Sequence, residues 1–246
     1  MKAIILAAGY ATRLYPLTKY TAKSLLKIGD QTILDYIVDK LARVHEVDEI
    51  FIVTNDKFYS SFVTWQKNYH GQKDIKIIND HTTSNETRLG AIADIQFVLD
   101  QEHINEDVIV LAGDNVFDFE LTEFVRFYQQ VGDDCITAHE LDDMDELQRT
   151  GVVELDANGR VLSFAEKPQE PQSNLAVPPF YIYQQSTLPL IETYLQEGGN
   201  PDAPGNFIPW LITQKDVYAY IFTGICDDIG TIESYQKVKQ QFSENK

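Results

Sequence analysis

Small residues follow a short apolar stretch near the start of the chain, in the run Leu6-Ala7-Ala8-Gly9-Tyr10-Ala11-Thr12-Arg13-Leu14. Alanine and glycine let backbone N–H groups approach a ligand closely, and a phosphate or another oxyanion is the usual ligand of such a turn. Arg13 and Lys23 could add positive charge to it. The dinucleotide motif G-x-G-x-x-G and the Walker motif do not fit, because Gly9 is the only glycine before Gly29. By itself the run predicts a generic phosphate-binding loop.

The distribution of charge makes this loop informative. The chain has a net charge of −18, from 20 basic and 38 acidic residues, which argues against a nucleic-acid-binding surface. An enzyme with this balance that binds polyphosphates must concentrate its positive charge locally and recruit a divalent metal. The first 30 residues do concentrate it, with the single acid Asp30 and the cations Lys2, Arg13, Lys19, Lys23 and Lys27. A solvated basic face would give the same pattern.

Two acidic residues far apart in the chain are candidate metal ligands. Asp114 follows the apolar segment 108–111, and open parallel sheets bind ligands beyond the carboxyl ends of their strands. Asp228 lies between a predicted strand and a predicted helix, where it could instead cap the helix. Mg²⁺ prefers one or two carboxylates together with phosphate oxygens and water, so the two acids would suit it if they converge. The neighbouring Asp227 is an alternative to Asp228.

Strand and helix patterns alternate in the first half of the chain. The predicted strands are 3–6, 49–53, 75–78, 108–111 and 135–138, and apolar stripes at helical spacing predict helices within 33–41, 89–99 and 121–128. Such alternation is typical of right-handed βαβ units. We therefore expect an α/β fold with a mostly parallel, twisted sheet flanked by helices.

The second half changes character. A hairpin is predicted over 152–164 around Asn158-Gly159, followed by a strand at 177–183, helices at 188–195 and 207–213, a strand at 217–222 and a closing helix at 232–242. No repeat or low-complexity linker separates the halves. We expect one domain over 1–246, with a parallel half to about residue 140, a smaller, more antiparallel portion from about 141, and the ligand site in the cleft between them.

Composition also bears on compartment. No run of about 18 apolar residues predicts a membrane span, and the apolar start is too short for a signal peptide, so we expect a cytoplasmic protein that binds neither membrane nor nucleic acid. Cys135 and Cys226 lack the nearby cysteine or histidine partners of a zinc site, and we expect two reduced, buried thiols in strands.

Segments spread over nearly the whole chain resemble the sugar-phosphate nucleotidyltransferases. That family's signature reads L-A-A-G-x-G-T-R-L-x-P-L-T, with P-K-x-L-L shortly after, and residues 6–18 and 22–26 are similar to it. Further similar segments follow in family order: Leu111-Ala112-Gly113-Asp114-Asn115, Gly151-Val152-Val153, Glu166-Lys167-Pro168 and Asp228-Ile229-Gly230-Thr231. The resemblance is closest to the glucose-1-phosphate thymidylyltransferases and uridylyltransferases, and it implies a Rossmann-like nucleotidyltransferase fold.

The resemblance implies a reaction and a role for each matching residue. A sugar 1-phosphate, expected to be glucose 1-phosphate, would attack the α-phosphorus of dTTP or UTP, and pyrophosphate would leave. Arg13 would hold the triphosphate, Lys23 would bridge the two phosphates, and Asp114 and Asp228 would bind Mg²⁺. The nucleotide-binding residues would be Leu6, Ala8, Gly9, Ala11, Thr12, Arg13, Ser84, Asn85 and Gly90. The residues that bind the sugar phosphate would be Lys23, Asn115, Gly151, Glu166 and Lys167. Residues 1–140 would then form the nucleotide half, and a homo-oligomer is compatible with the resemblance.

The chain departs from the family pattern at several positions. Ala11 replaces a glycine, so the loop is either narrowed by a methyl group or has a negative φ at that residue. Ala22 replaces the proline before Lys23, which predicts that the backbone presents Lys23 less rigidly. Residues 87–90 and 178–180 differ from the family pattern in the segments that select the base and the sugar. Ser84 or Asn85 could simply start the helix that runs to residue 99.

Two other functions remain compatible with the sequence. One is cytidylyl transfer to choline phosphate or a phosphonate, for which Phe180, Tyr181 and Tyr183 could supply an aromatic cage. The other is a non-catalytic subunit that senses nucleotide sugars. The presence of Arg13 and Lys23 together with both candidate metal ligands favours an enzyme.

Overall fold

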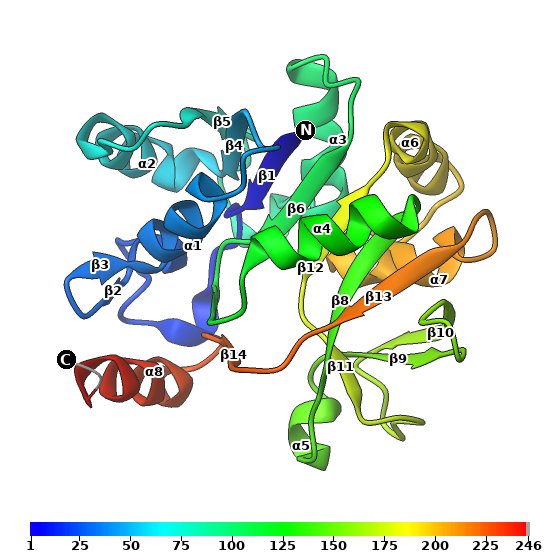
Figure 1. Ribbon diagram of the computed structural model, residues 1–246. Coiled ribbons are helices and arrows are strands. Elements are labelled where there is room, and N and C mark those ends of the chain that lie inside the picture. Colours follow the sequence, from blue (N-terminus) through cyan, green and yellow to red (C-terminus); the bar gives the residue numbers. More distant parts are fainter. Residues whose placement is uncertain (245–246) are drawn as a thin grey trace.

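The computed structural model describes residues 1–244, through which one ten-stranded sheet runs (Figure 1). Its strands are β1 (Lys2–Leu6), β4 (Glu49–Thr54), β5 (Asp74–Asn79), β6 (Val108–Ala112), β8 (Asp134–Glu140), β9 (Gly151–Leu155), β10 (Val161–Glu166), β11 (Leu175–Val177), β12 (Phe180–Tyr183) and β13 (Val217–Ile221). They lie in the order β10-β9-β11-β8-β12-β6-β1-β4-β5, and β13 pairs with β8.

The half of the sheet built from β1, β4, β5 and β6 is parallel, as the alternating pattern predicts. β1 lies between β4 and β6, and Leu6 is in register with both Val53 and Ala112. The loop that follows β1 therefore begins at the same edge of the sheet as the turn that follows β6. This shared edge places the residues after 6 next to the residues after 112.

The other half of the sheet is mixed and corrects one predicted element. β12 is antiparallel to both β6 and β8, whereas β13 is parallel to β8. The single strand expected at 177–183 is two strands, because Pro178 and Pro179 have no N–H to donate to a ladder. Before the break, β11 pairs with β8 and β9, and after it β12 lies between β6 and β8. The predicted hairpin around Asn158-Gly159 is confirmed as β9 and β10.

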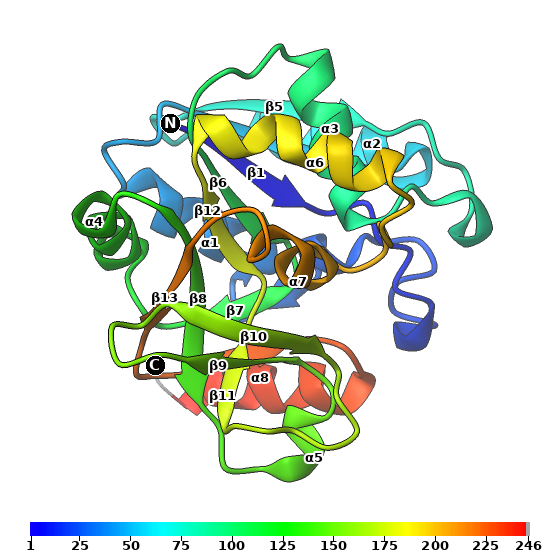
Figure 2. The same cartoon turned by 90° about the vertical axis from the view of Figure 1, so that its right-hand side faces the viewer.

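Helices cover both faces of the sheet (Figure 2). α1 (Ile33–Ala42), α2 (Asp56–Asn68) and α4 (Leu121–Val131) pack on one face, and α3 (Ala91–Gln101), α6 (Leu188–Gln196) and α7 (Ile208–Leu211) pack on the other. The two remaining helices are the short α5 (Met144–Leu147) and the closing α8 (Ile232–Glu244). The expected α/β class with a smaller antiparallel portion is confirmed. Within residues 1–244, no helix is both long and apolar enough to cross a membrane.

The structure adds one helix that was not predicted and decides where another begins. α2 is not predicted by the apolar pattern, because only Phe58 and Phe62 of its residues are buried. The helix predicted within 89–99 is confirmed as α3, and because it begins at Ala91, after Gly90 with a φ of 94°, neither Ser84 nor Asn85 starts it. Ser84 caps only the short 3-10 turn η3 (Asn85–Thr87), so a separate ordered segment precedes the long helix.

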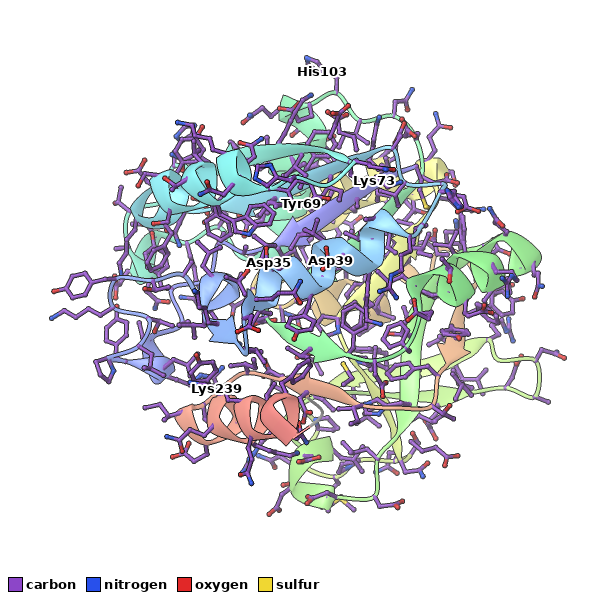
Figure 3. All side chains as sticks on the ribbon, turned by 60° about the vertical axis from the view of Figure 1, so that its left-hand side comes forward. Asp35, Asp39, Tyr69, Lys73, His103 and Lys239 are labelled. Carbon is purple, nitrogen blue, oxygen red and sulfur yellow. The ribbon has the colours of Figure 1, made fainter. Side chains whose placement is uncertain are left out.

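A polar contact fixes α2 against α1. Asp35 completes a capping box with Thr32 at the start of α1, and its other oxygen accepts a hydrogen bond of 2.8 Å from Trp65 Nε1 on α2. Figure 3 shows Asp35 and Asp39 on α1 with Tyr69 and Lys73 beyond them, and Tyr69 stacks on Trp65. The position of α2 matters because its first turn lies beside the loop that follows β1.

Four further 3-10 turns and two small sheets complete the chain. The turns are η1 (Thr12–Leu14), η2 (Lys23–Leu25), η4 (Gln185–Thr187) and η5 (Pro204–Phe207). One small sheet pairs β2 (Lys27–Ile28) with β3 (Gln31–Thr32), and the other pairs β7 (Asn115–Phe117) with β14 (Cys226–Asp228). Cys135 in β8 and Cys226 in β14 are both free, and Cys135 is the more buried of the two.

Candidate active site

The loop after β1 presents a row of backbone donors. Its scaffold bonds run from Ala7 N to Val53 O at 2.9 Å, and from Asn55 Nδ2 to Ala8 O at 2.8 Å. Within residues 1–244, the N–H groups of the next positions donate to no protein acceptor: Ala8, Gly9, Tyr10 and Ala11. Backbone donors are rarely left without a partner unless water or a ligand satisfies them. A run of such donors suits an oxyanion.

Ala11 keeps the conformation that a glycine would adopt. Its φ is 46° and its ψ is 44°, so the suggested negative φ is wrong. A side chain in this left-handed region costs about 1 to 2 kcal/mol. The Ala11 carbonyl accepts hydrogen bonds from Thr18 Oγ1 at 2.7 Å and from Leu14 N at 3.0 Å, which hold the turn in place. The loop therefore retains its shape despite the methyl group.

Lys23 is the point at which both candidate metal ligands meet. Its Nζ lies 2.7 Å from Asp114 Oδ2 and 3.1 Å from Asp228 Oδ1. The lysine begins η2, and the φ of −59° at Ala22 is one that proline also adopts, so the direction of the chain before Lys23 does not depend on a proline. Only 12 % of the Lys23 side chain is exposed. The ammonium is thus held in one place by two carboxylates.

The small β7/β14 sheet brings the two acids together. Asp228 is in register with Asn115, the residue after Asp114. Asp228 does not cap α8, because Thr231 Oγ1 accepts the hydrogen bond from Ser234 N at 3.1 Å. The alternative ligand Asp227 forms an ion pair of 3.2 Å with Lys237. The structure therefore selects Asp228 as the partner of Asp114.

Gly113 allows the close approach of β6 to the residues around Lys23. Its N–H donates to Leu6 O at 2.8 Å, and a Cβ at this position would lie 2.9 Å from both Leu6 O and Ser24 Oγ. Asn115 is 4 % exposed, and its Nδ2 donates to Asp114 Oδ1 at 2.9 Å. Asn115 therefore positions the Asp114 carboxylate, and a contact between Asn115 and a sugar phosphate stays a prediction.

Burial and charge act against each other at these groups. Burial would lower the pKa of Lys23, but Asp114 and Asp228 outweigh it and raise that pKa, so the ammonium stays protonated. Burial and the charge of Asp114 raise the pKa of Asp228, against the opposing effects of Lys23 and Arg13. Because 61 % of the Asp228 side chain is open to solvent, water screens part of these interactions. Arg13 itself is exposed at the loop.

The donor set at this point fits magnesium. Two carboxylates converge on one cation, and the second oxygen of Asp114 accepts the hydrogen bond from Asn115. Within residues 1–244 there is no group of three or more His, Cys, Asp or Glu side chains arranged to bind a metal. A zinc site needs such a set, whereas Mg²⁺ completes its shell with phosphate oxygens and water. Asp114 and Asp228 could therefore hold Mg²⁺ together with a phosphate substrate.

The segment that contains Ser84, Asn85 and Gly90, which the resemblance assigns to binding of the nucleotide base, contacts both the loop after β1 and the second half of the chain. Thr82 Oγ1 lies 3.3 Å from the Tyr10 hydroxyl and also contacts Asp80. At the other end, Arg88 forms an ion pair of 2.8 Å with Asp202. A cavity of about 400 Å³ lies there, lined by Glu86, Arg88, Leu89, Asn200, Pro201 and Asp202. This cavity does not include Lys23.

Three of the five residues predicted to bind the sugar phosphate lie together where two neighbouring strands end: Gly151, Glu166 and Lys167. Glu166 on β10 is in register with Gly151 on β9. Lys167 has a φ of 49°, and its Nζ lies 3.4 Å from Glu166 Oε1. Gly205 packs on this group, since a Cβ there would lie 2.4 Å from Glu166 Oε2. No sequence pattern pointed to Gly205, because its closeness to Glu166 arises only from packing.

A comparison with known families identifies the chain. The family model described as nucleotidyl transferase matches residues 2–245. The chain belongs to the nucleotidyl transferase family. A glucose-1-phosphate adenylyltransferase of Fervidobacterium nodosum (strain ATCC 35602 / DSM 5306 / Rt17-B1) is 28 % identical over 246 residues, covering 94 % of this chain and 59 % of that protein. The chain thus spans less than two thirds of the length of this relative.

The names of further relatives of this nucleotidyl transferase refer to a different nucleotide base. The UTP–glucose-1-phosphate uridylyltransferase AglF of Haloferax volcanii is 29 % identical over 183 residues, covering 74 % of this chain and 72 % of that protein. Among solved structures, a UDP-glucose pyrophosphorylase complexed with UDP-glucose superposes with a TM-score of 0.82 at 22 % identity, covering 100 % of this chain and 99 % of that one. This likeness supports the fold.

Proposed function

We propose that the protein transfers a nucleoside monophosphate from a nucleoside triphosphate to a sugar 1-phosphate and releases pyrophosphate. The observation that carries the proposal is the convergence of Lys23, Asp114 and Asp228 beside a loop whose N–H groups lack protein acceptors. Together these groups supply positive charge, a metal site and oxyanion donors. Phosphoryl transfer depends mainly on such positioning and electrostatic stabilisation.

In this reaction an oxygen of the sugar phosphate forms a bond to the α-phosphorus. The bond from the α-phosphorus to the bridging oxygen breaks, and its electron pair leaves with pyrophosphate. Lys23 would lie between the α-phosphate and the sugar phosphate, reducing the repulsion between two anions. Arg13 and the N–H groups of Gly9 to Ala11 would bind the phosphates that leave.

Asp114 and Asp228 would hold Mg²⁺, which supplies charge neutralisation at the reacting phosphate. Asn115 keeps the Asp114 carboxylate oriented through its hydrogen bond of 2.9 Å. Because Lys23 now occupies the point between the two carboxylates, its ammonium must share them with the metal. Lys23 and the metal would then both face the transferred phosphate.

The proposed acceptor is glucose 1-phosphate, and the proposed donor is dTTP or UTP. Glu166 has an oxygen for vicinal sugar hydroxyls, Gly151 leaves the backbone open beside it, and Lys167 would reach the sugar phosphate. Ser84, Asn85 and Gly90 would line the base site. Support for a hydroxyl-rich acceptor also comes from the relatives, whose names include glucose-1-phosphate enzymes for adenylyl and uridylyl transfer.

The burial of the aromatic residues argues against choline phosphate as the acceptor. Phe180, Tyr181 and Tyr183 are 0 %, 2 % and 1 % exposed. They lie within the sheet and pack against the helices on its two faces. A cage for a quaternary ammonium needs rings that a ligand can reach. The aromatic cage considered from the sequence therefore does not form.

A matrix of triphosphates and sugar 1-phosphates tests the proposal. Pyrophosphate release would be measured with Mg²⁺ for dTTP, UTP, ATP, GTP and CTP against glucose 1-phosphate and its common relatives, with choline phosphate as a further acceptor. We expect turnover with at least one sugar phosphate and its loss in Asp114→Asn. Asp118→Asn, which removes a carboxylate just after β7, is the matched control. No turnover with any pair would sink the proposal.

A further inference from the structure

Lys57 lies beside the loop that follows β1, and its side chain has no acidic partner there. It is the second residue of α2, and its Nζ lies 4.5 Å from the ring centre of Phe58, 5.6 Å from that of Tyr15 and 6.0 Å from that of Tyr10. Tyr10 and Tyr15 both belong to the segment that follows β1. Within residues 1–244, Lys57 forms no ion pair with a carboxylate. Its ammonium therefore stands over the loop on aromatic rings alone.

The start of α2 cannot move away from this loop. Asn55, the N-cap of α2, is fully buried, and its side chain donates to Ala8 O at 2.8 Å while accepting from Phe58 N at 3.2 Å. Further along, the hydrogen bond from Trp65 Nε1 to Asp35 ties the helix to α1. The backbone of Lys57 is thus held at the rim of the loop, while its exposed side chain remains free to turn.

Stability does not explain a lysine at this position. A cation in the first turn of a helix opposes the positive end of the helix dipole. Contacts of an exposed ammonium with aromatic faces are weak, so they offset this cost only in part. The presence of a lysine at this position is therefore better explained by the binding of an anionic ligand at the loop than by a contribution to folding stability.

The charge around the loop supports the same conclusion. Many cations of this chain pair with carboxylates, as Lys2, Lys76 and Arg160 do. Arg13 and Lys57, in contrast, are exposed beside the same loop, and neither forms an ion pair within residues 1–244. In a protein with a net charge of −18, two such cations beside four unpaired N–H groups make a local site for a polyanion.

We infer that Lys57 binds the terminal phosphates of the nucleoside triphosphate and the pyrophosphate that leaves. The inference rests on the proposed function. Lys23 is committed to the end of the site where Asp114 and Asp228 lie, so the α-phosphate belongs there, and the rest of the triphosphate extends over the loop towards Arg13 and Lys57. A charge-assisted bond to a phosphate is stronger than an exposed contact with a ring, so the ammonium leaves the tyrosines when the ligand binds.

Binding measurements separate this role from other roles of Lys57. Calorimetry in Mg²⁺ buffer would compare UTP, UMP and inorganic tripolyphosphate. For Lys57→Met we expect affinity for UTP and tripolyphosphate to fall by about tenfold, the loss typical of one charged hydrogen bond, with UMP affinity unchanged. Lys57→Arg should retain most of the affinity. Lys67→Met removes the same charge from the exposed far end of α2 and should bind all three ligands normally.

Three results would overturn the inference. The first is an equal loss of affinity for UTP and UMP in Lys57→Met, which would place Lys57 at the base. The second is tripolyphosphate binding by Lys57→Met as tight as in the unchanged protein. The third is no tripolyphosphate binding by the unchanged protein. The thermal midpoint of each variant reports whether α2 still docks. Pyrophosphate release by the unchanged protein tests the proposed function separately. If the protein releases pyrophosphate but its tripolyphosphate binding does not depend on Lys57, only the role of Lys57 is contradicted.

Discussion

The ammonium of Lys23 lies 2.7 Å from Oδ2 of Asp114, although the two residues are 91 positions apart in the chain. Asp228, 205 positions from Lys23, contacts the same ammonium at 3.1 Å. The contacts depend on two packing features: Gly113 against Leu6 and Ser24, and the pairing of β7 with β14. A protein with a net negative charge thus holds a largely buried ammonium where two acids meet.

Removing this cation should abolish most of the activity. Lys23→Met leaves Asp114 and Asp228 facing each other and, in the proposed reaction, would deprive the transferred phosphate of its positive partner. Loss of one such electrostatic contact costs about 100- to 1,000-fold in kcat. Pyrophosphate release at saturating substrates measures it. Lys27→Met, four residues on and exposed, is the matched control and should keep its activity. A Lys23→Met enzyme within a few-fold of the control would contradict the assignment.

A methyl group at Gly205 should weaken sugar binding selectively. It would collide with Glu166 Oε2 at 2.4 Å and with Phe164 Cζ at 2.9 Å, so the carboxylate must move. Gly205→Ala should raise the KM for the sugar phosphate by about tenfold, as loss of one hydrogen bond to a charged group does, and leave the KM for the triphosphate unchanged. Steady-state kinetics with each substrate varied would show the split.

The control for Gly205 is a similar collision far from the sugar residues. A Cβ on Gly71 would meet the Tyr69 ring, with Tyr69 Oη at 1.9 Å. Gly71→Ala should therefore lower stability without changing either KM. If Gly205→Ala behaves in the same way, Gly205 is only a packing residue.

Asp94 should make stability fall as pH rises. Burial, with the nearby charge of Asp80, raises the pKa of Asp94 from 3.8 to about 8. The folded protein therefore keeps a proton that the unfolded chain releases above pH 4. The stabilisation is complete below pH 4 and is lost as pH rises to about 8, at up to about 1.4 kcal/mol per pH unit. The effect acts on the fold and needs no substrate.

Urea unfolding at pH 6 and pH 8 measures the contribution of Asp94. The unchanged protein should lose about 2 kcal/mol more than Asp94→Asn between these values, because the asparagine has no proton to release. Asp100→Asn on the exposed side of the same helix controls for the change in net charge. Identical pH slopes for the unchanged protein and Asp94→Asn would show that Asp94 is ionised in the fold.

Replacing Ala11 by glycine should stabilise the loop. The φ of 46° at Ala11 strains an alanine, and glycine relieves most of a cost of about 1 to 2 kcal/mol, less the entropy it adds to the unfolded chain. We expect a net gain of about 0.5 to 1 kcal/mol, seen as a thermal midpoint higher by about 2 °C. Ala8→Gly, at a residue without a positive φ, should instead be destabilising.

The candidate site could be predicted from the sequence only where the pattern is local. The phosphate loop lies directly after a buried strand, and the Asp228 segment carries a recognisable motif, so both could be named. α2 was missed because only Phe58 and Phe62 mark its buried face, and Lys57 was missed with it. Gly205 gives no signal, because its closeness to Glu166 depends on how η5 packs on β10.

The sequence by itself determined the parallel half of the sheet, the loop after β1, the basic segment around it and the acids at 114 and 228, because each depends on neighbouring residues. Only the tertiary structure decided which aspartate faces Lys23, that Ala11 keeps a positive φ, and that the aromatic residues 180, 181 and 183 are buried. These outcomes follow from the pairing of β7 with β14, from the hydrogen bonds to the Ala11 carbonyl, and from helices covering both faces of the sheet. The first and third outcomes join segments that are far apart in the chain, and the second depends on a side-chain hydrogen bond from Thr18 that the residue types alone do not reveal.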